Sequence, residues 1–584
     1  MILQALAKHY EVLVQQKKLD QPGWANAKIS YALSVSAQGE LEQVGITKIL
    51  PPQDAKKAAP IPRTISLPAP VKRSSGVAPN FLWDNSSYLL GVDSKGKPQR
   101  SIDCFNACKA LHHELLDGVD SPAAKALLAF FDHWDPSQAQ HHPALQDDWE
   151  DLITGANLVF RHNGSFVHED PLIRQAWQNH YDAETDGPRT VCLVTGREGP
   201  VEAVHPSIKG VAGAQSSGAA LVSFNAPAFC SYGKEQNLNA PVSKQAAFAY
   251  TAALNYMLAD REHLLRVGDT TVLFWAKGGQ IGYQDLLFGA LVGETPTYAP
   301  GEIAGMVKSM LQGDHVQYNG TMLDPQMDFY ILGLSPNAAR LSVRFFLHNT
   351  FGGFLKNTQA HQDRLKIVRP TNDKFDSIPL WRLLGATVNQ NSRDKSPSPV
   401  MAGETLRAIL TNTRYPASLL NGVTLRIRAE HQIDRTRAAI LKAYYLKNRN
   451  PDIPKEVLTV SLNSTCDDPA YVLGRLFSVY EAIQTAANPG INTTIKDKYF
   501  NSAASTPTTI FPILGNLAQK HQRKLKGSNM GLYVFYEKQL GEISSLLGPT
   551  FPTRMSLPQQ GSFQLGYYHQ TQDRYQKKED TKNV

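Results

Sequence analysis

The chain has few cysteines for its length. There are 5 in 584 residues, an odd number at scattered positions, which argues against the disulfide framework of a secreted protein. Cys104 and Cys108 form a C-x3-C pair, but no second Cys or His pair follows at zinc-finger spacing. We therefore expect a reducing compartment, no bound metal, and a helix that carries both of these cysteines.

Long apolar segments are also missing. Near the N-terminus the first cation is Lys8, and Glu11 stands where a signal peptide would still be apolar. The longest apolar run, Gln245 to Ala259, is shorter than the roughly 20 residues that cross a bilayer. We expect no export signal, no membrane contact and a cytoplasmic location, with this run forming a buried helix.

Signatures of catalysis are scarce as well. The His-His-Glu sequence at 112–114 does not match H-E-x-x-H, and the His pair at 141–142 has no carboxylate at ligand spacing. No G-x-S-x-G nucleophile elbow occurs. Pro451-Asp452 resembles the start of a nuclease motif, but Leu458 stands where a catalytic lysine would be needed. We expect a protein that is not an enzyme and uses no cofactor.

Positive charge is in small excess and unevenly distributed. The chain has 59 Lys and Arg against 52 Asp and Glu, a net charge of +7 at pH 7. From residue 470 to the end there are 13 basic and 7 acidic residues, so a net charge of +6 lies in the last fifth. The total is too small to identify a nucleic-acid binder, and it is the local concentration that favours one.

The hydrophobic pattern predicts an α+β protein of several domains. A chain of this length buries more than one core. We expect mixed α/β regions at 1–155 and 156–400, a helical connector at 401–469, and a C-terminal helical bundle at 470–584.

Several elements can be placed more closely. Alternation at residues 29–35 before Gly39 predicts a β-hairpin, and Asn163-Gly164 predicts a second, because both turn positions of a two-residue hairpin need positive φ. Two apolar stretches, 189–196 and 270–276, predict buried strands. Helical patterns lie at 427–448, 471–486, 508–526 and 531–547.

Two segments have the composition of ligand-binding loops. Residues 51–76 hold six prolines and several cations, so they form no central strand and are expected to be an extended loop that reaches a ligand. The second, from His205 to Ser243, is glycine-rich and nearly free of acids. It lacks G-K-[ST] and G-x-G-x-x-G, which disfavours nucleotide binding. Its candidate nucleic-acid contacts, unless it is only a tight structural loop, are Lys209, Gln215, Ser216, Ser217, Asn225 and Lys234.

Two further groups of basic residues could bind nucleic acid or could simply be solvated. Arg340 and Arg344 alternate with apolar residues, which predicts one strand face that suits phosphates or is merely solvated. A helical stripe can bind nucleic acid or simply favour the helix dipole at a solvated helix end; it consists of Lys520, Arg523, Lys524 and Lys526.

Long blocks of the sequence are specific enough to compare with a known family. They are MILQAL, GVAPNFLWDNSSYLLG, HPSIKGVAGAQSSGAALVSFNAPAFCSYGKEQ, YILGLSPNAARLSVRFF and KDKYFNSAASTPTTIFPILGNLAQKHQRKLK, spread over nearly the full length. Together they resemble the large subunit of the type I-C CRISPR interference complex, Cascade.

The resemblance implies a non-catalytic subunit that recognises a protospacer-adjacent motif, promotes duplex opening, stabilises the R-loop and permits recruitment of a separate helicase-nuclease. Implied partners are crRNA, target double-stranded DNA with its displaced single strand, and the backbone, crRNA-processing and small subunits. The family also suggests that the C-terminal helical part exists as a separate small subunit made from an internal start.

On this basis we assign roles to the basic groups. The displaced strand would contact the C-terminal stripe, and the central loop would contact DNA or the end of the crRNA. The motif duplex would contact small and basic residues that fit a narrow groove, namely Lys72, Arg73, Ser74, Ser75, Gly76 and Asn80. The alternatives are a nuclease with an unrecognised active site and a purely architectural subunit.

Overall fold

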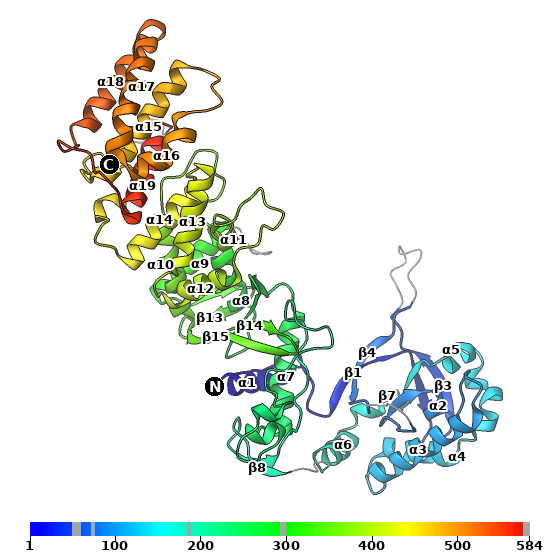
Figure 1. Cartoon of the computed structure of the whole chain (residues 1–584). Coiled ribbons are helices and arrows are strands. Elements are labelled where there is room, and N and C mark those ends of the chain that lie inside the picture. The colour runs from blue at the N-terminus through cyan, green and yellow to red at the C-terminus, as the bar shows by residue number, and fades with distance from the viewer. Residues whose placement is uncertain (50–59, 72–75, 184–187, 293–299, 576–584) are drawn as a thin grey trace. The chain divides into compact units, whose positions relative to one another are not determined.

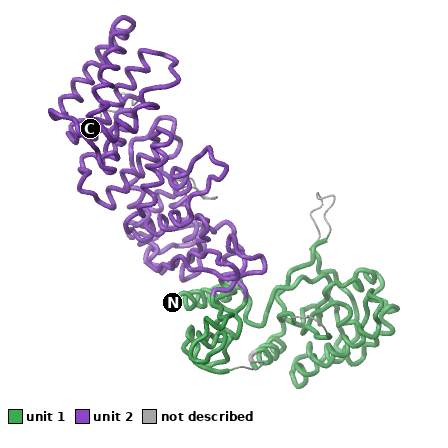
Figure 2. Tube along the Cα trace, viewed as in Figure 1, with its two compact units in different colours: residues 1–206, 222–253 green, residues 207–221, 254–584 purple. Residues whose placement is uncertain are grey.

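The computed structural model describes residues 1–49, 60–71, 76–183, 188–292 and 300–575. They form two compact units (Figure 2): unit 1 consists of residues 1–206 and 222–253, and unit 2 of residues 207–221 and 254–584. Each unit contains sheets and helices and has its own hydrophobic core. The α+β, multidomain fold class is thereby confirmed. The predicted boundaries at 155, 400 and 469 describe smaller pieces and stay predictions.

The largest sheet of unit 1 has five strands. Its order is β3-β2-β6-β5, with β7 pairing to β6, and β2 runs parallel to β6 while the other pairs are antiparallel. The strands are β2 (Tyr31–Val35), β3 (Leu41–Ile46), β5 (Trp83–Asn85), β6 (Asn157–His162) and β7 (Ser165–Phe166). Helices α3 (Pro98–Leu116) and α4 (Pro122–His133) pack beside this sheet (Figure 1). Leu33, Phe130 and Phe160 are fully buried between them.

Local sequence signals explain several of these elements. The hairpin β2–β3 turns at Gly39, which has φ +82°. Asn163 and Gly164 have φ values of 49° and 79° and connect β6 to β7, as predicted. The Ser121 hydroxyl accepts a hydrogen bond from the Ala124 amide at 3.3 Å and caps α4.

The rest of unit 1 consists of short elements around this sheet. Strands β1 (Trp24–Ile29) and β4 (Arg63–Pro68) form a two-stranded sheet, so part of the predicted proline-rich loop is an edge strand with Pro68 as its last residue. The other elements are α1 (Ile2–Gln15), α2 (Ser86–Leu89), α5 (Trp149–Ile153), α6 (Pro171–Ala183), β8 (Arg189–Val191), β9 (Glu198–Pro200) and most of α7 (Lys244–Ala259).

Unit 2 begins with a four-stranded antiparallel sheet. Its order is β10 (Leu265–Val267), β11 (Thr270–Ala276), β14 (Asp328–Asn337) and β15 (Arg340–Thr350). Every residue of β11 is buried, which confirms the predicted strand. One face packs Phe274 and Phe329 into the core, where Phe351, the first residue of the following helix, meets Phe329. The elements around it are α8 (Gly282–Val292), α9 (Pro300–Gln312), α10 (Phe351–Leu365) and the small hairpin of β12 (Val316–Tyr318) and β13 (Thr321–Leu323).

The remainder of unit 2 is helical. The connecting helices are α11 (Leu380–Gly385), α12 (Pro399–Thr411), α13 (Ala417–Glu430) and α14 (Arg435–Asn448), and the bundle consists of α15 (Pro469–Ala487), α16 (Ile495–Ser505), α17 (Pro507–Ser528), α18 (Met530–Ser544) and α19 (Leu557–Asp573). Figure 1 shows the bundle as the orange and red part of the chain. The expected C-terminal helical bundle is confirmed, and α16 and α19 are additions to it.

Two predicted elements are wrong. Residues 189–196 do not form a buried strand: β8 has three residues, and Val191 and Leu193 are 55% and 63% exposed. Within the described residues, strand β8 pairs with β9 alone, in a two-stranded sheet. Residues 427–448 are not one helix either, because His431 has φ +51° and the Asp434 carboxylate caps a new helix by accepting from the Arg437 amide at 2.8 Å.

A buried helix does form at α7, as predicted from its apolar run, and Cys104 and Cys108 lie on α3. Among the helices of the described residues, none combines the length and the apolar character that a bilayer crossing requires.

Candidate nucleic-acid interface

The glycine-rich stretch is shared between the two units. Residues 207–221 belong to unit 2 and residues 222–243 to unit 1. Lys209, Gln215, Ser216 and Ser217 are therefore in unit 2, whereas Asn225 and Lys234 are exposed residues of unit 1. The structure does not place the six predicted contacts in one site.

In unit 2 the stretch folds as a closed loop on the edge of β15. Ile208 and Ala219 exchange backbone hydrogen bonds of 2.9 and 2.8 Å, and the Leu341 amide donates to the Ala220 carbonyl at 2.9 Å. Gly218 has φ +105°, and a Cβ there would lie 2.7 Å from the Cβ of Ser207. This glycine thus serves the fold of the loop, as the structural interpretation of the stretch requires.

The loop and the end of α7 enclose a cavity of about 790 Å³. Asn255 on α7 fastens the loop, because its carbonyl oxygen accepts from the Lys209 amide at 2.8 Å and its amide nitrogen donates to the Ser207 carbonyl at 3.1 Å. This leaves the Lys209 side chain exposed at the cavity wall, together with Ser217. Gln215 and Ser216 are exposed on the adjoining turn.

Arg261 is the second cation of this cavity, and the sequence pattern did not point to it. It is exposed, and no carboxylate is among the residues that line the cavity. The neighbouring Asp260 is engaged by His263, whose Nδ1 lies 2.6 Å from Asp260 Oδ2 and whose Nε2 lies 2.5 Å from Asp285 Oδ1. The hydrogen bond with Asp285, supported by Asp260, raises the pKa of His263 to about 9. Asp260 is held by His263, and Lys209 and Arg261 form a positively charged pair at the cavity wall that suits a phosphate.

The two arginines of β15 do not form the shared basic face that was predicted. The register between β14 and β15 shifts where Gly333 pairs with Phe345 and Leu334 with Val343, which leaves Arg344 as the extra residue of a bulge. This bulge breaks the alternation from which a shared face with Arg340 was predicted. Arg344 Nη2 lies 2.8 Å from Asp269 Oδ2, so its charge is largely compensated.

The C-terminal stripe is exposed on the surface of α17. All four of its basic residues, on α17, are exposed, and among the described residues none of them forms an ion pair with a carboxylate. Lys524 Nζ donates to the Asn488 side-chain oxygen at 2.8 Å, and Lys526 Nζ lies 5.7 Å from the centre of the Tyr533 ring. The stripe therefore keeps the charge required to bind a nucleic-acid backbone.

Of the predicted motif-contacting residues, Lys72, Arg73, Ser74 and Ser75 lie outside the described residues. Gly76 is exposed, with φ +93° and open space where a Cβ would stand, and its carbonyl accepts from Arg100 Nη2 at 3.0 Å. Asn80 is 4% exposed, and its side-chain oxygen accepts from the Val71 amide at 3.0 Å. Asn80 thus links the two sides of residues 72–75, and its contact with DNA stays a prediction.

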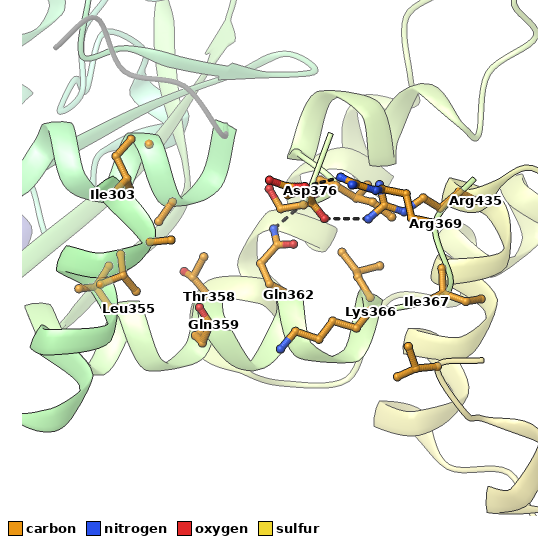
Figure 3. Close-up of a pocket in the computed structure, with 18 residues that line it drawn as sticks. Ile303, Leu355, Thr358, Gln359, Gln362, Lys366, Ile367, Arg369, Asp376 and Arg435 are labelled. Atoms are coloured by element: carbon orange, nitrogen blue, oxygen red, sulfur yellow. Dashed lines mark hydrogen bonds and ion pairs between the residues drawn. The ribbon is translucent and has the colours of Figure 1, made fainter. Parts of the chain in front are cut away.

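A second cavity of unit 2, about 490 Å³, has a different character (Figure 3). Ile303 and Leu355 lie at one end, and Asp376 faces Arg369 and Arg435 at the other. Arg369 forms an ion pair with Asp376, and Arg435 donates to the Asp376 carbonyl at 2.7 Å. Both arginines of this cavity thus bind groups of the protein itself.

The arginines at the start of α14 also form ion pairs within the fold. Arg435 is 6% exposed and lies 3.2 Å from Asp373, which also accepts two hydrogen bonds from Arg382. Arg437 forms an ion pair with Glu430. These ion pairs assign Arg435 and Arg437 to the internal packing of the connector.

A family comparison decides to which class of proteins these basic surfaces belong. The family model described as CRISPR-associated protein (Cas_Csd1) matches residues 6–575. The chain belongs to the Cas_Csd1 family. No curated protein matches the chain.

Membership in the Cas_Csd1 family confirms the resemblance found in the sequence. The chain is a CRISPR-associated subunit of the type I-C Cascade kind, and the partners of such a subunit are, in general, crRNA and other Cascade subunits. Within this Cas_Csd1 protein, the Lys209–Arg261 cavity and the α17 stripe combine exposed cations with an absence of paired carboxylates in the described part of the chain.

Proposed function

We propose that this chain is a non-catalytic large subunit that recognises a protospacer-adjacent motif on double-stranded DNA, promotes duplex opening and stabilises the R-loop. It then permits a separate helicase-nuclease to act. The observation that carries the proposal is the Cas_Csd1 match over residues 6–575. The exposed cations of the Lys209–Arg261 cavity and of the α17 stripe support it, because phosphate contacts dominate nucleic-acid affinity.

The basic groups divide this work between them. Residues 72–76, with Asn80 fastening Val71 beside them, are proposed to read the motif. Lys209, Arg261 and Ser217 are proposed to hold a phosphate of the DNA or of the crRNA end. The α17 stripe is proposed to hold the displaced strand, since a row of cations can follow a single-stranded backbone.

Motif recognition is tested with the assembled complex. Binding is measured to duplexes that carry the matched target and differ only in the flanking motif, with the native chain and with Arg73→Ala/Ser75→Ala. We expect binding that depends on the motif with the native chain and loses that dependence with the variant.

A matched variant, Arg63→Ala/Ser66→Ala on β4, controls for the loss of one cation and one hydroxyl nearby. If binding by the Arg73/Ser75 variant still depends on the motif, residues other than these two recognise it. No dependence on the motif with the native chain would reject the proposal and favour an architectural subunit.

A further inference from the structure

Unit 1 contains a cleft of about 1130 Å³ that is lined by none of the residues predicted from the sequence. Its walls come from α1, α6, the β8–β9 hairpin and the start of α7. Pockets for small molecules usually measure about 300–1,000 Å³, so this cleft is large enough for a segment of a polymer.

Four basic side chains from three separate parts of the chain line this cleft. They are Lys8 on α1, Arg189 and Arg197 on the β8–β9 hairpin, and Lys244 at the start of α7. The lining includes two carboxylates, Glu11 and Glu198, which leaves a net charge of +2. Within the described ranges none of the four cations forms an ion pair.

These cations are exposed rather than used by the fold. Lys8, Arg189 and Arg197 are exposed, and Lys244 is half-buried with its Nζ 4.3 Å from the centre of the Tyr181 ring. A cation held over an aromatic ring keeps its charge and its donors for another ligand. The described lining of the cleft thus brings together four cations and two carboxylates.

The polar groups between the cations include neutral amides. Gln4, Gln21 and Gln245 are exposed on the cleft wall. Each amide offers both a donor and an acceptor, which is the combination that base edges require.

We propose that this cleft binds a single-stranded nucleic acid, with Lys8, Arg189, Arg197 and Lys244 contacting phosphates and the glutamines facing the bases. A single strand can enter a cleft of this size and expose its bases, whereas a duplex keeps them paired. This is a contact area beyond those assigned to motif reading and to the α17 stripe. The displaced DNA strand and the crRNA share the phosphate chemistry.

The test uses the full chain and a fluorescein-labelled oligothymidylate or the matching oligouridylate. Affinity is measured by anisotropy over a series of NaCl concentrations. For Arg189→Gln/Arg197→Gln we expect the slope of log affinity against log salt to fall by about 1.4, that is about 0.7 for each lost single-strand contact. Arg189→Lys/Arg197→Lys keeps the charge and should keep the slope.

The matched control is Lys95→Gln/Lys97→Gln, which removes two exposed cations from the same unit. Circular dichroism melting shows whether each variant folds, and Lys8→Gln/Lys244→Gln replaces the arginine pair if that variant does not. A smaller slope for both oligonucleotides supports recognition of phosphates in DNA and RNA strands alike. A smaller slope for only one of them identifies that kind of strand as the ligand.

A slope equal to that of the control pair for both oligonucleotides would overturn the proposal. Normal oligonucleotide binding together with failed assembly with the other Cascade subunits would also overturn it, and would assign the cleft to an acidic protein surface. Motif-dependent binding of duplexes by the assembled complex is a separate measurement, so failure here and failure of the proposed function can be told apart.

Discussion

Lys209 and Arg261 carry the charge of the unit 2 cavity, and their freedom depends on neighbours that hold other groups in place. Asn255 accepts a hydrogen bond from the backbone amide of Lys209 and not from its side chain. The Asp260 carboxylate, next to Arg261 in the sequence, contacts the His263 ring. The proposed phosphate site thus combines two residues that are far apart in the sequence.

We predict that Lys209→Gln/Arg261→Gln weakens binding of crRNA by the full chain. Because two phosphate contacts are lost, the slope of log affinity against log salt should fall by about 1.4. Fluorescence anisotropy over a salt series measures this, with Lys308→Gln/Lys395→Gln as a control that removes two exposed cations of the same unit. Equal slopes for both variants would show that the cavity does not hold a phosphate of the crRNA.

His263 gives unit 2 a dependence on pH. Its pKa is raised from 6.5 to about 9, chiefly by Asp285 and also by Asp260. A raised pKa in the folded state means that protonation stabilises the fold. This contribution is complete below about pH 6.5, decreases above it, and is lost once the pH passes about 9.

We therefore predict that the native chain loses stability relative to His263→Gln as the pH rises from 6.5 to beyond 9. Thermal unfolding at a series of pH values measures the difference between the two proteins. His141→Gln, at an exposed position, should follow the native curve. A constant difference between native chain and His263→Gln across this range would contradict the assignment.

At the scale of elements, α15 and α19 approach each other through glycines. A Cβ at Gly474 would lie 2.0 Å from the Phe563 carbonyl oxygen, and one at Gly566 would lie 2.1 Å from the Tyr471 carbonyl oxygen. These are backbone contacts, which cannot yield as a flexible side chain does. The two helices therefore pack at a distance that only glycine allows.

Gly474→Ala should lower the free energy of unfolding by about 1–3 kcal/mol or more, the usual cost of overpacking a core. Gly541→Ala on α18 is the matched control, because its Cβ meets nothing within 4 Å and alanine favours a helix by up to about 1 kcal/mol over glycine. Thermal and urea unfolding compare the two variants. Equal stability for both would contradict the close packing of α15 on α19.

The helices that sequence periodicity predicts and those it misses differ in what they bury. Helix α17 buries residues spaced three or four apart, from Phe511 to Leu525, whereas α19 is rich in glycine and glutamine and is buried on nearly all sides. No stripe of apolar residues marks such a helix. At β8 the opposite happened: an apolar run predicted a buried strand, and the strand is exposed. An apolar run indicates burial only where another layer of the fold covers it.

The candidate site is predictable only in part for a related reason. Lys209 and Ser217 were found because composition marks their loop, while Arg261 was missed because it follows an ordinary apolar helix. The pairing of Arg344 with Asp269 and the bulge at this residue depend on tertiary contacts and strand register. Local sequence contains neither.

At the scale of the whole molecule, the chain passes between the two units three times. It leaves unit 1 after Pro206, returns at Val222 and leaves again after Ala253, so neither unit is one continuous segment. Cations without carboxylate partners among the described residues line the cleft of unit 1 and both the cavity and the α17 stripe of unit 2. Each unit thus has its own basic surface, which we propose contacts nucleic acid.

The central claim is that this Cas_Csd1 protein opens target DNA without cutting it. The most direct test follows a matched duplex with 2-aminopurine in the target strand, incubated with the crRNA-containing complex and Mg²⁺, with and without this chain, and compares the same samples on a denaturing gel. We predict a rise in fluorescence that requires this chain, with both strands intact. Cleaved strands, or opening that does not need this chain, would contradict the claim.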